Sequence, residues 1–216
     1  PFGGEGKSGT GPKAGGPLYL KRLQRGAITA PAHQRQANPG LDSLIAWAKS
    51  QGHQHIAGLA EQYSRSSQLG SMTTLPGPTG ERNTLALLPR GAVVCAAGSV
   101  DGLLNQLAAT LATGNIALMT ADTASLLPSD LPAAARTRIQ TVSSLDNADF
   151  QIVLAESKLA AQLHGPLAAR SGALVGLIAT DEDHAIPLWR LLAERALCVN
   201  TTAAGGNASL MTLQST

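Results

Sequence analysis

The residues best placed to bind a nucleotide phosphate lie in one short turn, Ala97-Gly98-Ser99-Val100-Asp101-Gly102. The turn follows an apolar run and precedes an amphipathic segment, which is where an α/β domain holds pyrophosphate on a glycine-rich loop. Its sequence is not GxGxxG, and Asp101 would place a negative charge beside the ligand. The phosphate-loop pattern GxxxxGK[ST] does not occur either. We therefore expect that this chain binds no cofactor.

Nucleophilic catalysis and metal binding also find little support in the sequence. The nucleophile elbow GxSxG is missing. His53 and His55 lie two positions apart on an expected helix, so they do not share a face. Several acidic residues are expected to be solvated helix caps: Glu61, Asp122, Glu156 and Asp181–Asp183. These patterns predict no catalytic residue and no metal site in this chain.

The two cysteines, Cys95 and Cys198, lie in apolar, strand-like runs and form no CxxC motif. Free cysteine in such a run behaves as a small buried hydrophobe, so we expect both thiols to be buried. This usage is typical of a reducing compartment. The sequence also shows no signal peptide and no apolar run of transmembrane length. Together these features predict a cytoplasmic location.

The net charge of the 216-residue chain is +2, but it is unevenly spread. Residues 1–90 carry ten Lys and Arg against four Asp and Glu, whereas residues 91–216 carry six against ten. The basic half is either an ordinary solvated surface or a face for an acidic partner. Because aromatic residues make up only 3% of the chain and do not alternate with the basic ones, nucleic-acid binding is not expected.

Strands and helices alternate after residue 85. Residues 91–97 predict a buried strand, residues 100–113 a helix capped by Ser99, and residues 116–119 a second strand. Such a βαβ unit implies a parallel sheet with right-handed crossovers. The pattern continues with expected strands at 138–142, 151–154 and 173–179 and helices at 158–169 and 183–194. We expect an α/β fold with a Rossmann-like, doubly wound parallel sheet.

Loops and a small helical segment are predicted before this sheet. Residues 1–16 are rich in glycine, and residues 70–83 are expected to be irregular. Apolar residues at helical spacing predict two short helices, at 41–48 and 56–63, with a break near Gly52.

The end of the chain predicts a β-hairpin flap. Residues 197–200 and 208–213 are the expected strands, and Gly205, Gly206 and Asn207 form the expected turn. A two-stranded hairpin is barely stable by itself, so we expect this one to be docked on another surface.

Three stretches carry a family resemblance: PFGGEGKSGTGPKAGGPLYL at 1–20, LPGPTGERNTLALLPRG at 75–91 and VNTTAAGGNASLM at 199–211. They resemble the C-terminal portion of the long, bifunctional proline utilization A family, which joins an FAD-dependent proline dehydrogenase to an NAD-dependent 1-pyrroline-5-carboxylate dehydrogenase of the aldehyde dehydrogenase superfamily. The resemblance implies four parts: the end of the aldehyde dehydrogenase catalytic domain (1–23), a linker with two short helices (24–84), a non-catalytic aldehyde-dehydrogenase-like Rossmann domain (85–196) and the hairpin flap (197–216).

The resemblance also implies what this chain contributes to catalysis. Phe2, Gly3 and Gly4 would line the aldehyde pocket, while the catalytic Cys and Glu would lie upstream of Pro1. Met119-Thr120 stands where the family has a Lys-Pro pair that contacts the adenosine ribose, so the cofactor site is expected to be lost. NAD and FAD would bind the parent enzyme elsewhere, and the fragment alone would be inactive.

The flap is expected to seal the cavity through which the intermediate passes between the two active sites. The residues implied in this seal are Asn200, Thr201, Thr202, Gly205, Gly206 and Asn207. The expected partners are the upstream aldehyde dehydrogenase and proline dehydrogenase domains of the same chain. A stand-alone NAD-binding module or an oligomerisation module is the alternative. Homo-oligomerisation and peripheral attachment of the parent to a membrane stay open.

Overall fold

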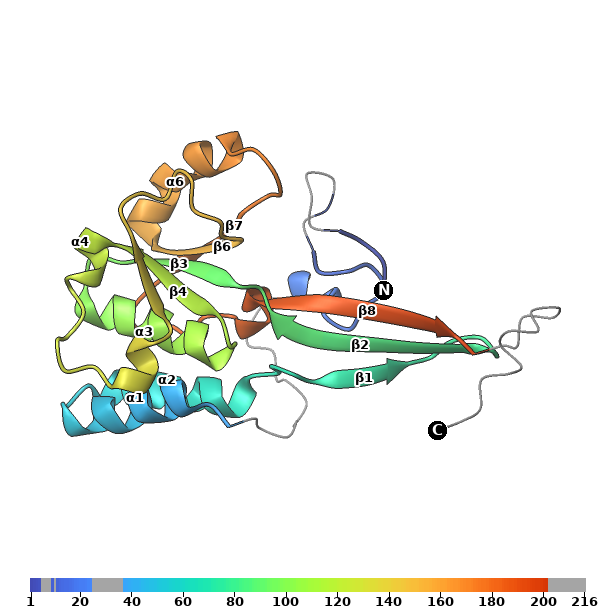
Figure 1. Cartoon of the computed structure of the whole chain (residues 1–216), viewed down its shortest axis with the longest axis horizontal. Helices are drawn as coiled ribbons and strands as arrows, with labels where there is room; N and C mark the ends of the chain where they lie inside the picture. The colour runs from blue at the N-terminus through green and yellow to red at the C-terminus, as the bar shows by residue number, and fades with distance from the viewer. Residues whose placement is uncertain (5–8, 10, 25–36, 202–216) are drawn as a thin grey trace.

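Two β-sheets organise the chain in the computed structural model, which describes residues 1–4, 9, 11–24 and 37–201. A five-stranded parallel sheet, flanked by helices, forms the body, and a three-stranded antiparallel sheet extends from it (Figure 1). Within the described residues, no helix is long and apolar enough to cross a lipid bilayer.

The parallel sheet contains β3 (Ala92–Ala96), β4 (Ile116–Thr120), β5 (Ile139–Val142), β6 (Ile152–Glu156) and β7 (Gly176–Thr180). Its strand order is β5-β4-β3-β6-β7. The first strand is therefore central, and the chain winds outward from it in both directions, which is the doubly wound arrangement. The predicted fold class is confirmed.

Helix α3 (Val100–Ala112) crosses between β3 and β4 and is buried along most of its length. Its N-cap is the predicted Ser99, whose Oγ accepts a hydrogen bond from the Gly102 amide at 3.0 Å. Gly114, at φ 70°, ends it in a conformation that favours glycine. The burial of α3 requires a cover on the face turned away from the sheet.

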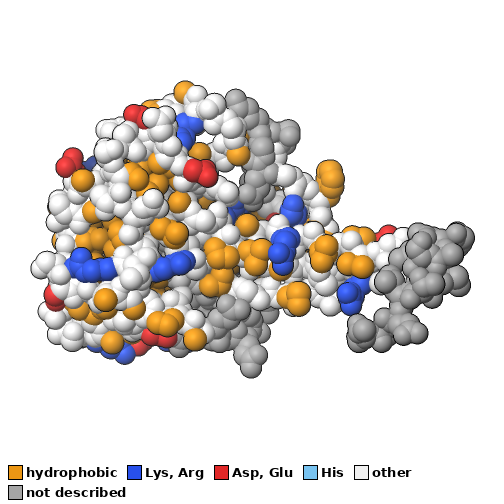
Figure 2. Space-filling view, in the orientation of Figure 1, with side chains coloured by type: hydrophobic (Ala, Val, Ile, Leu, Met, Phe, Trp, Pro, Cys, Tyr) orange, Lys and Arg blue, Asp and Glu red, His pale blue; other side chains and the backbone are white. Residues whose placement is uncertain are grey.

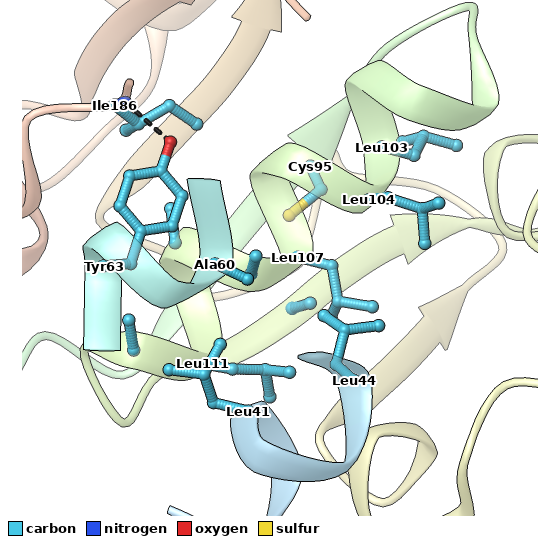
Figure 3. Packing of buried hydrophobic residues seen from close by; sticks show 14 of the residues in the cluster. Leu41, Leu44, Ala60, Tyr63, Cys95, Leu103, Leu104, Leu107, Leu111 and Ile186 are labelled. Carbon is cyan, nitrogen blue, oxygen red and sulfur yellow. Dashed lines mark hydrogen bonds between the residues drawn. The ribbon is translucent and has the colours of Figure 1, made fainter. Parts of the chain in front are cut away.

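That cover is the helix pair α1 (Pro39–Ser50) and α2 (Gln54–Ser66). Leucines of α1 and α3 and the α2 residues Ala60 and Tyr63 meet in one hydrophobic cluster (Figure 3). Helix α6 (Ser157–Ala169) packs with a second cluster that includes residues of β3, β4 and β6. The predicted helices thus form part of the core, while residues 25–36 of the expected linker lie outside the described residues.

The short helices α4 (Ala121–Ala124) and α5 (Ala133–Arg136) lie between β4 and β5. Near the N-terminus, a single 3-10 turn, η1 (Leu20–Arg22), falls in the segment predicted as the end of a catalytic domain.

The antiparallel sheet contains β1 (Met72–Leu75), β2 (Glu81–Pro89) and β8 (Leu192–Asn200) in the order β1-β2-β8. We call these three strands the arm. Strands β2 and β8 pair over nine residues, from Glu81 opposite Asn200 to Pro89 opposite Leu192. Two expectations are therefore wrong: residues 70–83 are not wholly irregular, and residues 183–194 do not form a helix.

The reason for the second error lies in tertiary pairing. Leu188, Leu191 and Leu192 are buried, and their i, i+3, i+4 spacing resembles that of a helix face. However, the 3-10 turn η2 (Leu188–Leu191) follows Pro187, and the chain then extends to pair with β2. A strand about 100 residues earlier in the sequence supplies the hydrogen bonds that a helix would have made internally.

The predicted hairpin is only partly described. Its first strand, 197–200, is the end of the longer strand β8. Its turn and second strand lie outside the described residues.

Candidate functional site

The crevice at the carboxyl ends of β3 and β6 is where this fold usually holds a ligand. Here Ser99 Oγ contacts Glu182 Oε2 at 2.9 Å and Glu156 Oε1 at 3.4 Å. The Glu156 carboxylate comes so close to the first turn of α3 that a Cβ added at Gly102 would lie 3.1 Å from Oε1. Two carboxylates therefore lie where the pyrophosphate of a dinucleotide would need positive charge.

Sequence reasoning missed these contacts. Glu156 and Asp181–Asp183 were expected to be solvated caps, but Glu156 and Glu182 both reach Ser99, and Asp181 Oδ1 accepts a hydrogen bond from Ser157 Oγ at 3.1 Å. These residues come from the ends of β6 and β7, so only the sheet order brings them to the start of α3. Their positions next to strand ends are the signal that could have indicated this meeting.

The side chains of His53 and His55 each lie next to a carboxylate. His53 Nδ1 lies 2.9 Å from Asp101 Oδ1, and its ring stacks on Trp47 with centroids 5.4 Å apart. His55 Nε2 lies 3.6 Å from Asp183 Oδ1. In the part of the chain that the structure describes, no group of three or more His, Cys, Asp or Glu side chains could hold a metal ion.

The predicted substrate-pocket residues Phe2, Gly3 and Gly4 lie at the surface. The Phe2 side chain is 88% exposed, and its backbone pairs with Ala14 through hydrogen bonds of 3.0 and 2.8 Å. Gly3 has φ 135°, a region that favours glycine. Nearby, the Lys13 amide donates to Glu194 Oε2 of β8 at 2.5 Å. The N-terminal loop is thus attached to the arm, while Phe2 is presented outward.

Of the predicted flap residues, the structure describes Asn200 and Thr201. Asn200 lies opposite Glu81, and the Thr201 amide donates to the Gly80 carbonyl at 2.7 Å. Thr202, Gly205, Gly206 and Asn207 lie outside the described residues. The roles of these predicted substrate-pocket and flap residues stay predictions.

The outer edge of β8 presents backbone donors. Since the Thr201 amide points toward β2, the alternation of an antiparallel ladder turns the Leu197 amide toward β2 as well and the Ala196 and Cys198 amides outward. Within the described residues, β8 is an edge of its sheet. It therefore offers a row of groups that another strand can pair with.

Side chains on the arm are also unusually exposed. Met72 is 72% and Leu197 54% exposed. Apolar side chains of the arm are visible at the surface in Figure 2. Cys198 is exposed too, so the expectation of two buried thiols is wrong for this residue, while Cys95 is buried. Desolvation and the neighbouring Glu81 carboxylate raise the pKa of the Cys198 thiol.

Comparisons with known proteins identify relatives for almost the whole chain. The bifunctional protein PutA of Escherichia coli (strain K12) is 41% identical over 234 residues, which cover 99% of this chain and 18% of that protein. PutA of Rhizobium meliloti is 39% identical over 225 residues, with the same two shares. This chain thus spans about a fifth of the length of these relatives. No protein-family model matches it.

Solved structures with a similar arrangement include two kinds of enzyme. One is proline utilization A with proline bound in remote sites, at a TM-score of 0.44 and 22% identity, covering 65% of this chain and 19% of the other. Another is substrate-bound AldH of Staphylococcus aureus, at a TM-score of 0.47 and 14% identity, covering 65% and 40%.

Proposed function

We propose that this chain, which is homologous over 99% of its length to a segment of bifunctional PutA proteins, is the C-terminal part of such an enzyme. The whole enzyme would oxidise proline to glutamate through 1-pyrroline-5-carboxylate. Its FAD-dependent and NAD-dependent active sites would lie in upstream domains of the same polypeptide, which are the partners of this segment. The sequence identity of about 40% with several PutA proteins supports this assignment.

Within that enzyme, we propose that the arm clamps along a strand of a neighbouring catalytic domain and so closes the cavity that holds the intermediate. The observation that carries this proposal is the outer edge of β8, which no other described strand covers and toward which the Ala196 and Cys198 amides are turned. Strand addition at such an edge pairs these donors with the carbonyls of a partner strand. A closed cavity keeps bulk water and the intermediate apart.

The body would act as the rigid base of this arm rather than as a second cofactor domain. The Glu156 carboxylate at the start of α3 supports this role, because it would repel a pyrophosphate at that position. It also disfavours the alternative of a stand-alone NAD-binding module. NAD and FAD would accordingly be bound by the upstream domains alone.

A pair of proline substitutions in the complete enzyme tests the clamp. Ala196→Pro removes an outward donor of β8, while Thr74→Pro removes the corresponding outward donor of β1, the opposite edge of the arm. Both positions are exposed, and neither amide is needed for the ladder within the arm. The two variants therefore differ in which edge they block.

The measurement is the time course of NADH formation from proline. We expect Ala196→Pro to introduce a lag, because the intermediate escapes before it is oxidised, and Thr74→Pro to follow the unaltered enzyme. Deletion of residues 197–216 should give the same lag or a loss of dehydrogenase activity. Absence of both effects in Ala196→Pro and in the deletion would show that the arm seals nothing.

A further inference from the structure

A cavity of about 600 Å³ lies at the amino ends of β6 and β7, at the opposite end of these strands from the crevice beside Ser99. Gln151 and Ile152 line it at the beginning of β6, and Gly176 lines it at the beginning of β7. The strands are parallel, so these amino ends face away from Ser99 and Glu156, which follow the carboxyl ends. The N-terminal loop and the segment from η2 into β8 complete the wall. This cavity is therefore separate from the position where the fold usually binds nucleotides.

Four basic residues converge on this cavity from three separate parts of the chain. Lys21 and Arg22 come from η1, Arg90 follows β2, and Arg190 belongs to η2. Glu194 is the one acidic residue among those that line the wall. The lining therefore carries an excess of positive charge at neutral pH.

Hydrogen bonds to backbone oxygens hold the guanidinium groups in place. Arg190 Nη2 donates to the Leu177 carbonyl at 3.1 Å, and Arg90 Nε donates to the Arg190 carbonyl at 3.0 Å. Arg22 Nη1 donates to the Gly11 carbonyl at 3.3 Å. Each guanidinium has five N–H donors in a rigid fork, so an arginine anchored in this way can also bind an oxyanion. The cations are thus positioned before any ligand arrives.

The positive charges of the arginines in this cavity repel one another. Burial lowers the pKa of Arg190, and the nearby charges of Arg90 and Arg22 lower it further. Burial also lowers the pKa of Lys21. A bound anion would offset this mutual repulsion.

Apart from Gln24, Gln151 and Glu194, the remaining wall is apolar. Its larger members are Leu18, Leu174, Pro187, Trp189 and Leu192. A cavity of this size with apolar walls and a few convergent charges suits a small organic molecule rather than a bare ion.

We propose that this cavity binds a small organic anion with two or more negative charges, carried by phosphate or carboxylate groups. The anionic groups would lie against Arg190, Arg90 and Arg22, and the carbon skeleton against Trp189 and Leu192. This inference goes beyond the proposed channelling role, which requires no ligand in this segment. Its failure would leave the clamp of β8 untouched, since the two are tested by different variants.

The test is isothermal titration of inorganic pyrophosphate and, separately, of citrate into the complete protein that contains this chain. Saturating NAD is present throughout, so that the dinucleotide site of an upstream domain is already filled. The unaltered protein is compared with Arg190→Gln, with Arg22→Gln and with a control, Arg65→Gln, which removes one positive charge from an exposed position on α2.

We expect at least one of the two anions to bind the unaltered protein and the control equally. Arg190→Gln should weaken binding about tenfold or more, because a charge-assisted hydrogen bond is lost. Arg22 is exposed, so Arg22→Gln should weaken binding by a smaller factor and leave the fold intact. Binding should also weaken as ionic strength rises. A preference for pyrophosphate would indicate a phosphate ligand, and a preference for citrate a carboxylate ligand.

Two outcomes would overturn the proposal. One is equal affinity in all four proteins, which would place the bound anion elsewhere. The other is no heat of binding for either anion at low ionic strength. That result would be expected if an acidic segment of the parent chain filled the cavity instead. Arg22→Gln keeps the test decisive even if Arg190→Gln fails to fold.

Discussion

The body and the arm differ in how much of their side-chain surface is buried. In the body, every residue of α3 from Gly102 to Ala112 is buried, because the sheet covers one face and α1 and α2 cover the other. In the arm, Arg195 to Cys198 of β8 are all exposed, and only the part near the body, with Leu87 and Leu192, contributes to a small hydrophobic cluster. The body thus contains its own core, whereas the arm exposes surface that a partner can contact.

This difference suggests that the body stabilises the fold and that the arm makes the contacts with partner domains. Burial of apolar surface is the main source of folding free energy, so the body should account for the stability of the chain. The exposed apolar side chains of the arm contribute little to that free energy. Changes in the arm should therefore affect partner contacts far more than they affect folding.

The largest expected effect is at the centre of the core. Leu107 of α3 is fully buried, so Leu107→Ala should lower the free energy of unfolding by about 2–5 kcal/mol. The matched change in the arm, Leu197→Ala, should lower it by less than about 0.5 kcal/mol. Urea denaturation followed by circular dichroism measures both. Equal losses at the two positions would contradict the division between body and arm.

A smaller effect is expected at the polar link between α2 and the loop before η2. Tyr63 Oη donates to Asn105 Oδ1 at 2.6 Å and accepts from the Ile186 amide at 2.8 Å. Tyr63→Phe would leave both partners buried and unsatisfied, so it should cost about 1–3 kcal/mol of unfolding free energy. Urea denaturation again provides the measurement, with Tyr19→Phe, at a more exposed tyrosine, as the control. A cost no larger than that of the control would show that these hydrogen bonds do not stabilise the body.

The raised pKa of the same tyrosine should lower the free energy of unfolding at alkaline pH. Burial raises the pKa of Tyr63 to about 12, above the value near 10 of an unfolded tyrosine. The unfolded state therefore loses its proton first, and the contribution of Tyr63 falls as pH rises from about 10 to about 12, by roughly 1 kcal/mol at pH 11. Burial also raises the pKa of Cys95 to about 12, which adds to the loss in the same direction.

Unfolding free energies measured between pH 8 and pH 11 test this expectation. The slope should be steeper in the unaltered protein than in Tyr63→Phe, because the substitution removes one of the groups whose pKa is raised in the folded state. Parallel slopes in the two proteins would contradict the assignment to Tyr63.

The smallest effect is expected at the exposed thiol. Cys198→Ser should change the free energy of unfolding by less than about 0.5 kcal/mol, since the side chain fills no core space. In the folded protein, a thiol reagent should modify Cys198 but not the buried Cys95. Mass spectrometry after limited alkylation locates the modified residue. Modification of Cys95 before Cys198 would contradict this assignment, because Cys95 can react only when the body opens.

The alternating strands and helices of the body were predictable because their signals are local. Glycines bound the apolar run of β3, and Ser99 and Gly114 mark the two ends of α3. Each βαβ unit makes its two strands parallel, so a parallel sheet follows from the order of the elements. Helices α1 and α2 were likewise indicated by apolar residues at helical spacing.

The arm was not predictable in the same way. Strand β8 replaces an expected helix because β2 supplies its hydrogen bonds from far away in the sequence. The exposure of Cys198 has the same origin, since an apolar strand is buried only if another layer covers it. The meeting of Glu156 and Glu182 at Ser99 was not predicted either, and only their positions after strand ends could have indicated it.

The amino-acid sequence by itself determined the elements of the body and the loss of the glycine fingerprint, because caps, turns and periodicity act over a few residues. Only the tertiary structure decided which distant residues meet: the carboxylates at the start of α3, the basic residues around the cavity, and the two long strands of the arm. Such meetings depend on strand order and on pairing across the chain, for which local residue patterns carry no signal.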